Sequence, residues 1–322
     1  MNNIMMFLIG IFLIVGIIVI IIILFLVWKQ NNHQDNYQNN EQNNYQKEQK
    51  KVKENLNDDI LTKNNLRNRQ IISDDRFLIK KKNIKTNKKI LVVNDLHVSF
   101  GENKILKGVN FDLNRGETIA IVGKNGAGKT VMMETVVGLI KKDKGEVNID
   151  FFDKKEPIWK ERKEIGMQFQ DSTVTKNIKA KHLINFYKEI YKEKINDDQI
   201  KEMIKIFGIK KILKEKIGKL SGGQKQRINL FLAIMHNPKL MILDEFITGL
   251  DIISVIDIIN YVNDLKIKNN SSMIIISHQP EEIKNLADRI LVLKDGIITL
   301  DTTPKKVEKE YESMTRFLME NI

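Results

Sequence analysis

The sequence contains the octapeptide Gly123-Lys124-Asn125-Gly126-Ala127-Gly128-Lys129-Thr130, which matches the phosphate-binding pattern G-x-x-x-x-G-K-[ST]. Before it, Thr118–Val122 is a short apolar run rich in β-branched residues. After it, residues 131–140 form a segment that is long enough for a helix. The glycine-rich loop therefore lies between a predicted buried strand and a predicted helix, which is the setting that this pattern requires.

The residue types in this loop suit a polyphosphate. Gly126 and Gly128 allow a tight bend that exposes backbone N–H groups, and these groups and the helix N-terminus can hold an anionic phosphate. Lys129 is expected to reach the β- and γ-phosphates, and the Thr130 hydroxyl to ligate Mg²⁺. The alternative is a glycine-rich turn without a ligand, but the complete pattern in its proper setting argues against it.

The composition sets broad limits. The chain has 322 residues with 42% apolar residues, enough for a sizeable core, and no cysteine, which excludes disulfides and thiolate metal sites. The formal net charge of +12 would suit nucleic acid, an anionic membrane or a phosphate ligand. The chain is also rich in Lys, Asn and Ile, as a biased genome composition would produce, so the bulk charge decides little.

An apolar, uncharged run at Ile4–Trp28 predicts one transmembrane helix at residues 4–28, since it exceeds the roughly 30 Å of a hydrocarbon core. A cleaved signal peptide is the alternative. Against it, Met1–Asn3 carries no basic side chain, and no small-x-small site follows. The lysines after the run predict a single-pass protein of the cell membrane, with the remainder on the cytoplasmic side.

Residues 29–89 are predicted to form a disordered linker, because the Asn- and Gln-rich stretch has little apolar surface to offset the entropy of ordering. Its end carries a basic cluster, composed of Lys80, Lys81, Lys82, Lys85, Lys88 and Lys89. This cluster fits either attraction to anionic lipid headgroups or a solvated linker.

From residue 90 the pattern becomes that of an α/β domain, predicted to span residues 90–322. Between Glu156 and about His236 the sequence is mostly helical in pattern, which predicts a helical subdomain over residues 156–236. Strands are expected at residues 90–93, 96–100, 109–113, 145–150, 240–243 and 273–276, with a hairpin formed by residues 290–293 and 296–299.

Two further motifs carry chemistry. A buried strand ends at Asp244-Glu245, where one carboxylate can hold Mg²⁺ and the other can polarise a water for attack on the γ-phosphate. Leu220-Ser221-Gly222-Gly223-Gln224 opens another helix, with Ser221 as its N-cap and open backbone N–H groups. A second anion-binding helix start is useful if two copies of the chain share a nucleotide.

In combination these motifs resemble the ATP-binding subunits of the ABC transporter family. The resemblance covers about two thirds of the chain, roughly Leu91 to Thr302. It rests on the ordered motifs GKNGAGKT, FQD at Phe169–Asp171, LSGGQ, LMILDE, and His278 after a strand. It implies a P-loop NTPase fold of the ABC ATPase type, with an N-terminal antiparallel β part and a helical subdomain, here preceded by one transmembrane helix.

The resemblance implies an ATP- and Mg²⁺-dependent ATPase. Phe100 would stack on adenine, with core packing as the alternative. Gln170, rather than nearby Gln168, would sense Mg²⁺ and the attacking water, Glu245 would be the general base, and His278 would contact the γ-phosphate. The implied metal site is Thr130, Gln170 and Asp244. The implied phosphate-binding residues are Gly123, Lys124, Asn125, Gly126, Ala127, Gly128, Lys129, Thr130 and Val131.

The same resemblance implies a homodimer or heterodimer of ATP-binding subunits. Ser221, Gly222, Gly223 and Gln224 would contact ATP on the opposite protomer, and Gly249–Asp251 would signal across the dimer. One departure is Phe246, where the family usually has Pro after the catalytic Glu.

The predicted function is to power an ABC transporter through a separate multi-span permease, because one helix cannot form a translocation path. Export is favoured, since residues 169–191 look similar to the helical insertion of exporter ATPases and the tail after Gly296 is short. The alternative is a membrane-tethered regulatory ATPase that acts mechanically on an envelope protein. No nucleic acid is expected as a partner, because Thr130 to Ser221 leaves no room for a long coiled coil.

Overall fold

The computed structural model describes residues 86–152, 156–168, 176–250 and 252–322, without the side chains of residues 252–254. These residues belong to one compact unit, Leu78–Ile322. The predicted transmembrane helix at residues 4–28, most of the linker at residues 29–89, and Gln170 and Asp251 lie outside the described residues. No helix in the described ranges is both long enough and apolar enough to span a bilayer.

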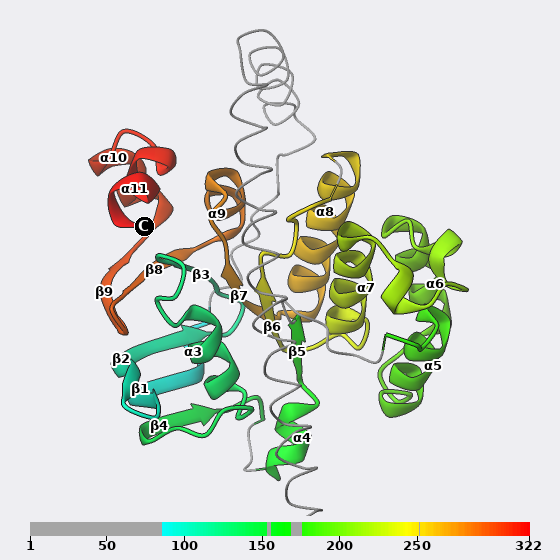
Figure 1. Cartoon of the computed structure of the whole chain (residues 1–322), viewed down its shortest axis with the longest axis horizontal. Helices are drawn as coiled ribbons and strands as arrows, with labels where there is room; N and C mark the ends of the chain where they lie inside the picture. The colour runs from blue at the N-terminus through cyan, green and yellow to red at the C-terminus, as the bar shows by residue number, and fades with distance from the viewer. Residues whose placement is uncertain (1–85, 153–155, 169–175, 251) are drawn as a thin grey trace, which may run out of the picture. The chain divides into compact units, whose positions relative to one another are not determined.

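A six-stranded sheet carries the fold, in the order β5-β6-β7-β3-β8-β9 (Figure 1). The first five strands in this order run parallel, and β9 pairs antiparallel with β8. All residues of β3, β6 and β7 are buried, as expected for strands covered on both faces. The strands are β3 (Thr118–Val122), β5 (Ile165–Gln168), β6 (Leu240–Asp244), β7 (Ser272–Ile276), β8 (Arg289–Lys294) and β9 (Ile297–Thr302).

A second, antiparallel sheet has the order β2-β1-β4 and consists of β1 (Lys89–Phe100), β2 (Asn103–Asn114) and β4 (Lys144–Ile149). The prediction of two separate strands at residues 90–93 and 96–100 is wrong, because β1 is continuous. The pairing register shifts between Val93 and Leu96, and Asp95 has a left-handed φ of 49°. This bulge breaks the alternation of apolar and polar residues, which is why the sequence pattern looked like two strands.

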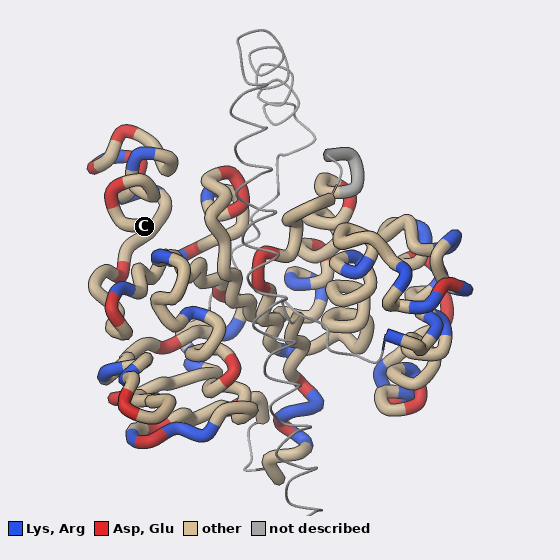
Figure 2. Tube along the Cα trace, in the orientation of Figure 1, with Lys and Arg blue, Asp and Glu red and all other residues tan. Residues whose placement is uncertain are grey.

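Helices lie between most of the strands in chain order, and two more follow β9 at the carboxyl end. The helices are α3 (Lys129–Val136), α4 (Ile158–Arg162), α5 (Ala180–Ile190), α6 (Asp197–Ile206), α7 (Gly222–Ile234), α8 (Ile252–Asn269), α9 (Pro280–Leu286), α10 (Pro304–Glu310) and α11 (Met314–Asn321), with 3-10 turns at Lys210–Ile212 and Ile217–Lys219. The two sheets share one apolar core with α3, to which Met132, Met133 and Val136 contribute. In Figure 2, acidic and basic segments alternate along the antiparallel sheet and along α5 and α6.

The expectation of a mostly helical stretch from Glu156 to about His236 missed β5. This strand has only four residues and pairs with β6 from Ile165↔Leu240 to Gln168↔Leu243, so it belongs to the six-stranded sheet. A four-residue segment gives too few positions for a periodic signal. The helices α5 and α6 and the start of α7 follow it.

Gly166 in β5 provides a stability test of this arrangement. A Cβ atom there would lie 1.9 Å from the Ala233 carbonyl oxygen in α7 and 2.8 Å from Pro238 Cγ. Because the backbone carbonyl cannot move aside without displacing the helix, Gly166→Ala is expected to lower the free energy of unfolding by about 3 kcal/mol in urea denaturation. The matched control is Gly222→Ala, where nothing lies within 4 Å of the added Cβ; equal stability of the two variants would contradict this packing.

Candidate active site

The parallel strands bring distant motifs together. The glycine-rich loop follows β3, Asp244 ends β6 with Glu245 directly after it, and His278 lies two residues beyond β7. Because β3, β6 and β7 are parallel neighbours, their carboxyl ends meet at one edge of the sheet. Ligands of open α/β sheets bind at this edge, so these residues form the candidate active site.

The glycine-rich loop needs glycine for different reasons at different positions. At Gly123 a Cβ would lie 2.2 Å from the Leu293 carbonyl oxygen of β8, so the loop runs tightly against the sheet there. At Gly126 nothing lies within 4 Å, but φ is 82°, a left-handed conformation that glycine adopts without strain. Lys124, Asn125 and Gly126 form the exposed tip of the loop, while Gly128 precedes the first turn of α3.

Lys129 is folded back onto this loop. Its Nζ donates to the carbonyl oxygens of Gly123 at 2.7 Å and Lys124 at 3.0 Å, and the residue is only 8% exposed. Burial lowers the pKa of Lys129, while the nearby carboxylates of Asp244 and Glu245 oppose that shift. The ammonium group has three N–H donors, and two of them go to these loop carbonyls. An anion at the loop could therefore accept the third.

Thr130 and Asp244 are joined directly, since Thr130 Oγ1 donates to Asp244 Oδ2 at 3.0 Å. Asp244 is 5% exposed, and burial raises its pKa, with Glu245 and Glu134 adding to the effect. The Thr130 hydrogen bond and Lys129 oppose it. A buried carboxylate beside a hydroxyl, with other acidic groups near, suits a divalent cation with a preference for oxygen ligands. The residues present therefore fit Mg²⁺.

Glu245 and His278 face each other at the same edge. His278 Nε2 lies 3.6 Å from Glu245 Oε1, and both side chains are about one third exposed. Burial lowers the pKa of His278, Lys129 lowers it further, and Glu245 opposes both. The imidazole is therefore mainly neutral near pH 7. A partly exposed carboxylate and a neutral imidazole can exchange protons with a water or a phosphate oxygen.

The backbone of Glu245 is held in an unusual conformation, with φ at 44°. Its N–H donates to the Ile276 carbonyl at 2.9 Å, and its own carbonyl accepts from Gln226 Nε2 at 2.8 Å and from Thr248 N at 3.0 Å. Phe246, where the family pattern has Pro, is fully buried. Buried packing of Phe246 and the hydrogen bonds of Glu245 thus fix the turn without the proline ring.

The remaining predicted residues lie as follows. Phe100 ends β1 and is 52% exposed, so the alternative of core packing is wrong for it. Ser221 caps α7: its hydroxyl accepts from Gln224 N at 3.3 Å, and Ser221 N donates to Gln224 Oε1 at 3.0 Å. The Gln224 side chain is therefore engaged within its own helix start. Ser221 and Gly222 are exposed, whereas a Cβ on Gly223 would lie 2.4 Å from the Gly249 carbonyl.

The sequence analysis did not single out Gln226, which holds the Glu245 carbonyl, or Glu282, which is buried near His278. Neither position carries a signal in the sequence alone, because a polar residue in a helix is ordinarily on its solvated face. Gln168, set aside in favour of Gln170, is 1% exposed, and neither polar atom of its amide has a partner in the described part of the chain.

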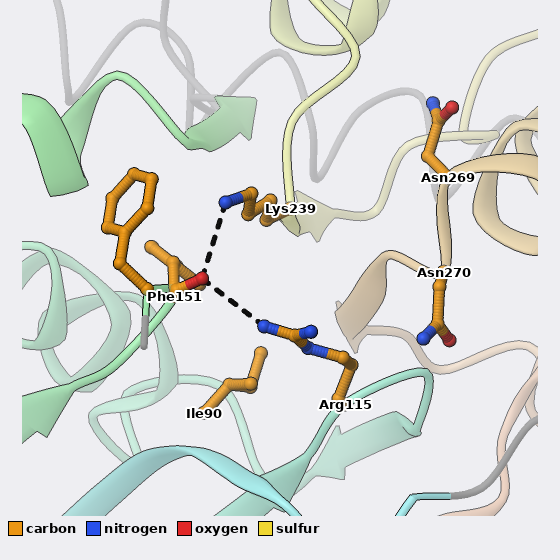
Figure 3. A pocket seen from close by; sticks show the side chains of 7 residues that line it. Ile90, Arg115, Phe151, Lys239, Asn269 and Asn270 are labelled. Carbon is orange, nitrogen blue, oxygen red and sulfur yellow. Dashed lines mark hydrogen bonds between the residues drawn. The ribbon is translucent and has the colours of Figure 1, made fainter. Parts of the chain in front are cut away.

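A separate pocket of about 260 Å³ lies away from this edge (Figure 3). Arg115, Lys239 and Asn270 line it and precede β3, β6 and β7, so it lies at the amino ends of the strands. Arg115 and Lys239 both donate to the Phe151 carbonyl, at 3.2 and 3.3 Å, as the dashed lines show. The glycine-rich loop follows the opposite end of β3, so this pocket is not part of the candidate active site.

Comparison with known proteins agrees with the motifs. The sequence model of the ABC transporter family matches residues 106–248. An energy-coupling factor transporter ATP-binding protein, EcfA2 of Caldanaerobacter subterraneus subsp. tengcongensis, is 34% identical over 223 residues, which cover 66% of this chain and 76% of the relative. The chain belongs to the ABC transporter family. It is an ATP-binding subunit of this family and an ATPase.

Other relatives extend this finding. The phosphonates import ATP-binding protein PhnC of Treponema denticola is 31% identical to this ABC subunit, over 64% of the chain and 86% of the relative. A solved ATP-binding cassette of an ABC transporter in its ADP conformation is similar with a TM-score of 0.55 and 26% identity, covering 72% of this chain and 99% of that one. The P-loop ABC ATPase fold, with its antiparallel β part and its helices, is therefore confirmed.

Proposed function

We propose that this subunit powers transport through a separate multi-span permease, as one of two ATP-binding subunits that share two nucleotides. The observation that carries the proposal is the meeting of three groups at one sheet edge: the glycine-rich loop with Lys129, the Thr130–Asp244 pair, and the Glu245–His278 pair. The exposed helix start at Ser221 supplies a second anion-binding element on the same chain.

Each residue has a proposed role in hydrolysis. Residues 123–131 bind the phosphates through backbone N–H groups and the Lys129 ammonium, while Thr130, Asp244 and Gln170 hold Mg²⁺. When bound, Mg²⁺ neutralises charge on the phosphate oxygens. Glu245 takes the proton of the attacking water, and the His278 imidazole donates a hydrogen bond toward the γ-phosphate. During the reaction, negative charge moves toward the leaving phosphate group, and the Lys129 ammonium stabilises that charge.

Phe100 is proposed to stack on the adenine ring, because a half-exposed aromatic side chain at the end of β1 has an open face. Phe100→Ala is expected to raise the KM for ATP about tenfold, equivalent to one lost stacking contact, while kcat changes little. Phe100→Trp keeps an aromatic face and serves as the control. Steady-state ATPase kinetics measure this KM. An unchanged KM in Phe100→Ala would show that Phe100 does not stack on adenine.

The dimer and the membrane complete the proposal. Ser221, Gly222 and Gly223 of one copy are proposed to close on ATP bound to the other, in either a homodimer or a heterodimer. We also propose that residues 4–28 anchor the subunit in the cell membrane, with the ATPase domain on the cytoplasmic side; the apolar run and the lysines that follow it support this.

Export remains the proposed direction on the basis of residues 169–191, of which residues 169–175 lie outside the described ranges. A specific observation favours import as the second candidate. Several relatives carry import in their names, among them the phosphonates import protein PhnC and the methionine import protein MetN. The membrane-tethered regulator that moves no solute is the third candidate.

The deciding experiment is purification of the full-length chain with its membrane neighbours, followed by identification of co-purifying multi-span proteins and solute transport in vesicles. A permease whose transport requires ATP, and stops when Glu245 is replaced by Gln, supports the proposal. Movement of the solute away from the side that holds ATP indicates export, and movement toward that side indicates import. Stimulated ATP hydrolysis with an envelope protein, but without any multi-span partner or solute movement, would instead support the regulator.

A further inference from the structure

Glu282 is an acidic side chain buried in α9 near the candidate active site. It is 2% exposed, whereas its neighbour Glu281 in the same helix is exposed. Its Oε2 accepts a hydrogen bond from Ser277 Oγ at 2.6 Å, and its Oε1 has no partner within the described residues. Burial of a carboxyl group costs free energy of folding, so a buried carboxyl group with an unpaired oxygen calls for a functional explanation.

The hydrogen bond extends to the loop that carries His278. Ser277 Oγ also accepts from the backbone N–H of Gln279 at 3.0 Å. In many helices a Glu in the first turn reaches back directly to the N-cap N–H, and here Ser277 stands between the two. His278 lies between Ser277 and Gln279, so this chain of hydrogen bonds fixes the backbone on both sides of His278.

The position of His278 is sensitive to this loop. Its Nε2 is 3.6 Å from Glu245 Oε1, just outside the range of a good hydrogen bond. A shift of a few tenths of an ångström toward Glu245 would form that hydrogen bond. The support of the loop therefore decides whether the imidazole turns toward Glu245 or stays available to a ligand.

We propose that Glu282 is a positioning residue for His278: its carboxyl group, acting through Ser277, sets the place of the imidazole beside the Glu245 carboxylate. This inference rests on the proposed roles of Glu245 and His278 in ATP hydrolysis. Glu282 itself contacts neither of them directly and touches no reacting atom. Its effect is transmitted through the turn between β7 and α9.

The protonation of Glu282 is consistent with such a role. Burial raises the pKa of Glu282 from 4.5 to about 8, the Glu245 carboxylate adds to the rise, and the Ser277 hydrogen bond opposes it. The carboxyl group is therefore mainly neutral at pH 7. Among the charged groups of the neighbouring helices, Lys284 of α9 pairs with Glu308 of α10, and Arg316 of α11 pairs with Glu312 and Glu320.

Ionisation of Glu282 would put a second negative charge near Glu245 and disturb the turn. Hydrolysis is therefore expected to decline as the pH rises through about 8. Stability follows the same sign: the folded state holds this proton more tightly than the unfolded state, so the free energy of unfolding falls as the pH rises from 4.5 to about 8. The part of each decline that comes from Glu282 should vanish when residue 282 cannot ionise.

The test compares Glu282→Gln and Glu282→Ala with the exposed control Glu281→Gln in the full-length protein. Glu282→Gln keeps an acceptor for Ser277 without a charge, so its kcat at pH 7 should stay within about twofold of the wild-type value. Its kcat should no longer decline through pH 8, whereas the decline should persist in Glu281→Gln. Glu282→Ala removes the acceptor and should lower kcat about tenfold, with ATP affinity and the far-ultraviolet circular dichroism retained.

Two results would overturn the proposal: an unchanged alkaline decline in Glu282→Gln, or wild-type kcat in Glu282→Ala. Loss of thermal stability in Glu282→Ala without a change in kcat would also refute it, because that pattern marks a purely structural group. A failure of the proposed roles of Glu245 and His278 would give a different result from a failure of the Glu282 proposal. In that case Glu245→Gln would hydrolyse ATP at the wild-type rate.

Discussion

Glu245→Gln is expected to bind ATP and Mg²⁺ normally but to lose hydrolysis by about 100-fold or more, because the attacking water loses its base. The amide is nearly isosteric with the carboxylate, and the backbone bonds of Glu245 to Ile276 and Gln226 do not involve the side chain. The fold and the loop geometry should therefore survive. Bound ATP should then hold two copies of the chain together, which size-exclusion chromatography with light scattering would detect.

The matched control for this variant is Glu134→Gln, since Glu134 lies in α3 and is the other acidic group that acts on the pKa of Asp244. That change should leave most of the hydrolysis intact. Turnover close to wild type in Glu245→Gln would show that another group activates the water, and the assignment of Glu245 would fall.

Lys129→Ala is expected to abolish ATP binding as well as hydrolysis. The Lys129 ammonium closes the loop by donating to the Gly123 and Lys124 carbonyls, and its positive charge lowers the pKa of the neighbouring Asp244 carboxyl group. Its removal loses two charge-assisted hydrogen bonds at about 1.5–3 kcal/mol each, together with the attraction for phosphate. Fluorescent nucleotide titration measures the loss.

Lys124→Ala provides the comparison for charge alone, because the Lys124 side chain is exposed at the tip of the loop while its carbonyl remains in place. ATP affinity should fall much less than in Lys129→Ala. Equal losses in the two variants would indicate that the loop attracts phosphate through net charge rather than through the buried ammonium of Lys129.

Much of this site could be read from the sequence, because its motifs are local. Gly123–Thr130 and Asp244-Glu245 each follow an apolar run, and a parallel sheet necessarily brings the ends of such runs to one edge. The bulge at Asp95 and the short strand β5 could not be predicted from the sequence. The bulge interrupts the alternation of apolar and polar residues, and β5 has too few residues to show such an alternation.

The supporting residues also could not be predicted. Gln226 reaches the Glu245 carbonyl from 19 positions earlier in the chain, and Glu282 is buried in α9, a helix that contacts α11 in the folded chain. Such contacts depend on tertiary packing rather than on spacing. Sequence patterns thus located the candidate catalytic and binding residues, whereas the structure was needed to find the residues that hold them in place.

We propose that each nucleotide site is built from two copies of the chain, and the mixing of two inactive variants can reveal this. Lys129→Ala lacks a working phosphate loop, and Ser221→Arg lacks a working helix start for the partner's ATP. In a mixed dimer, the intact loop of the second variant meets the intact Ser221 of the first. We expect the mixture to hydrolyse ATP although neither variant does so alone. A mixture as inactive as its components would show that a nucleotide site is not shared between two copies.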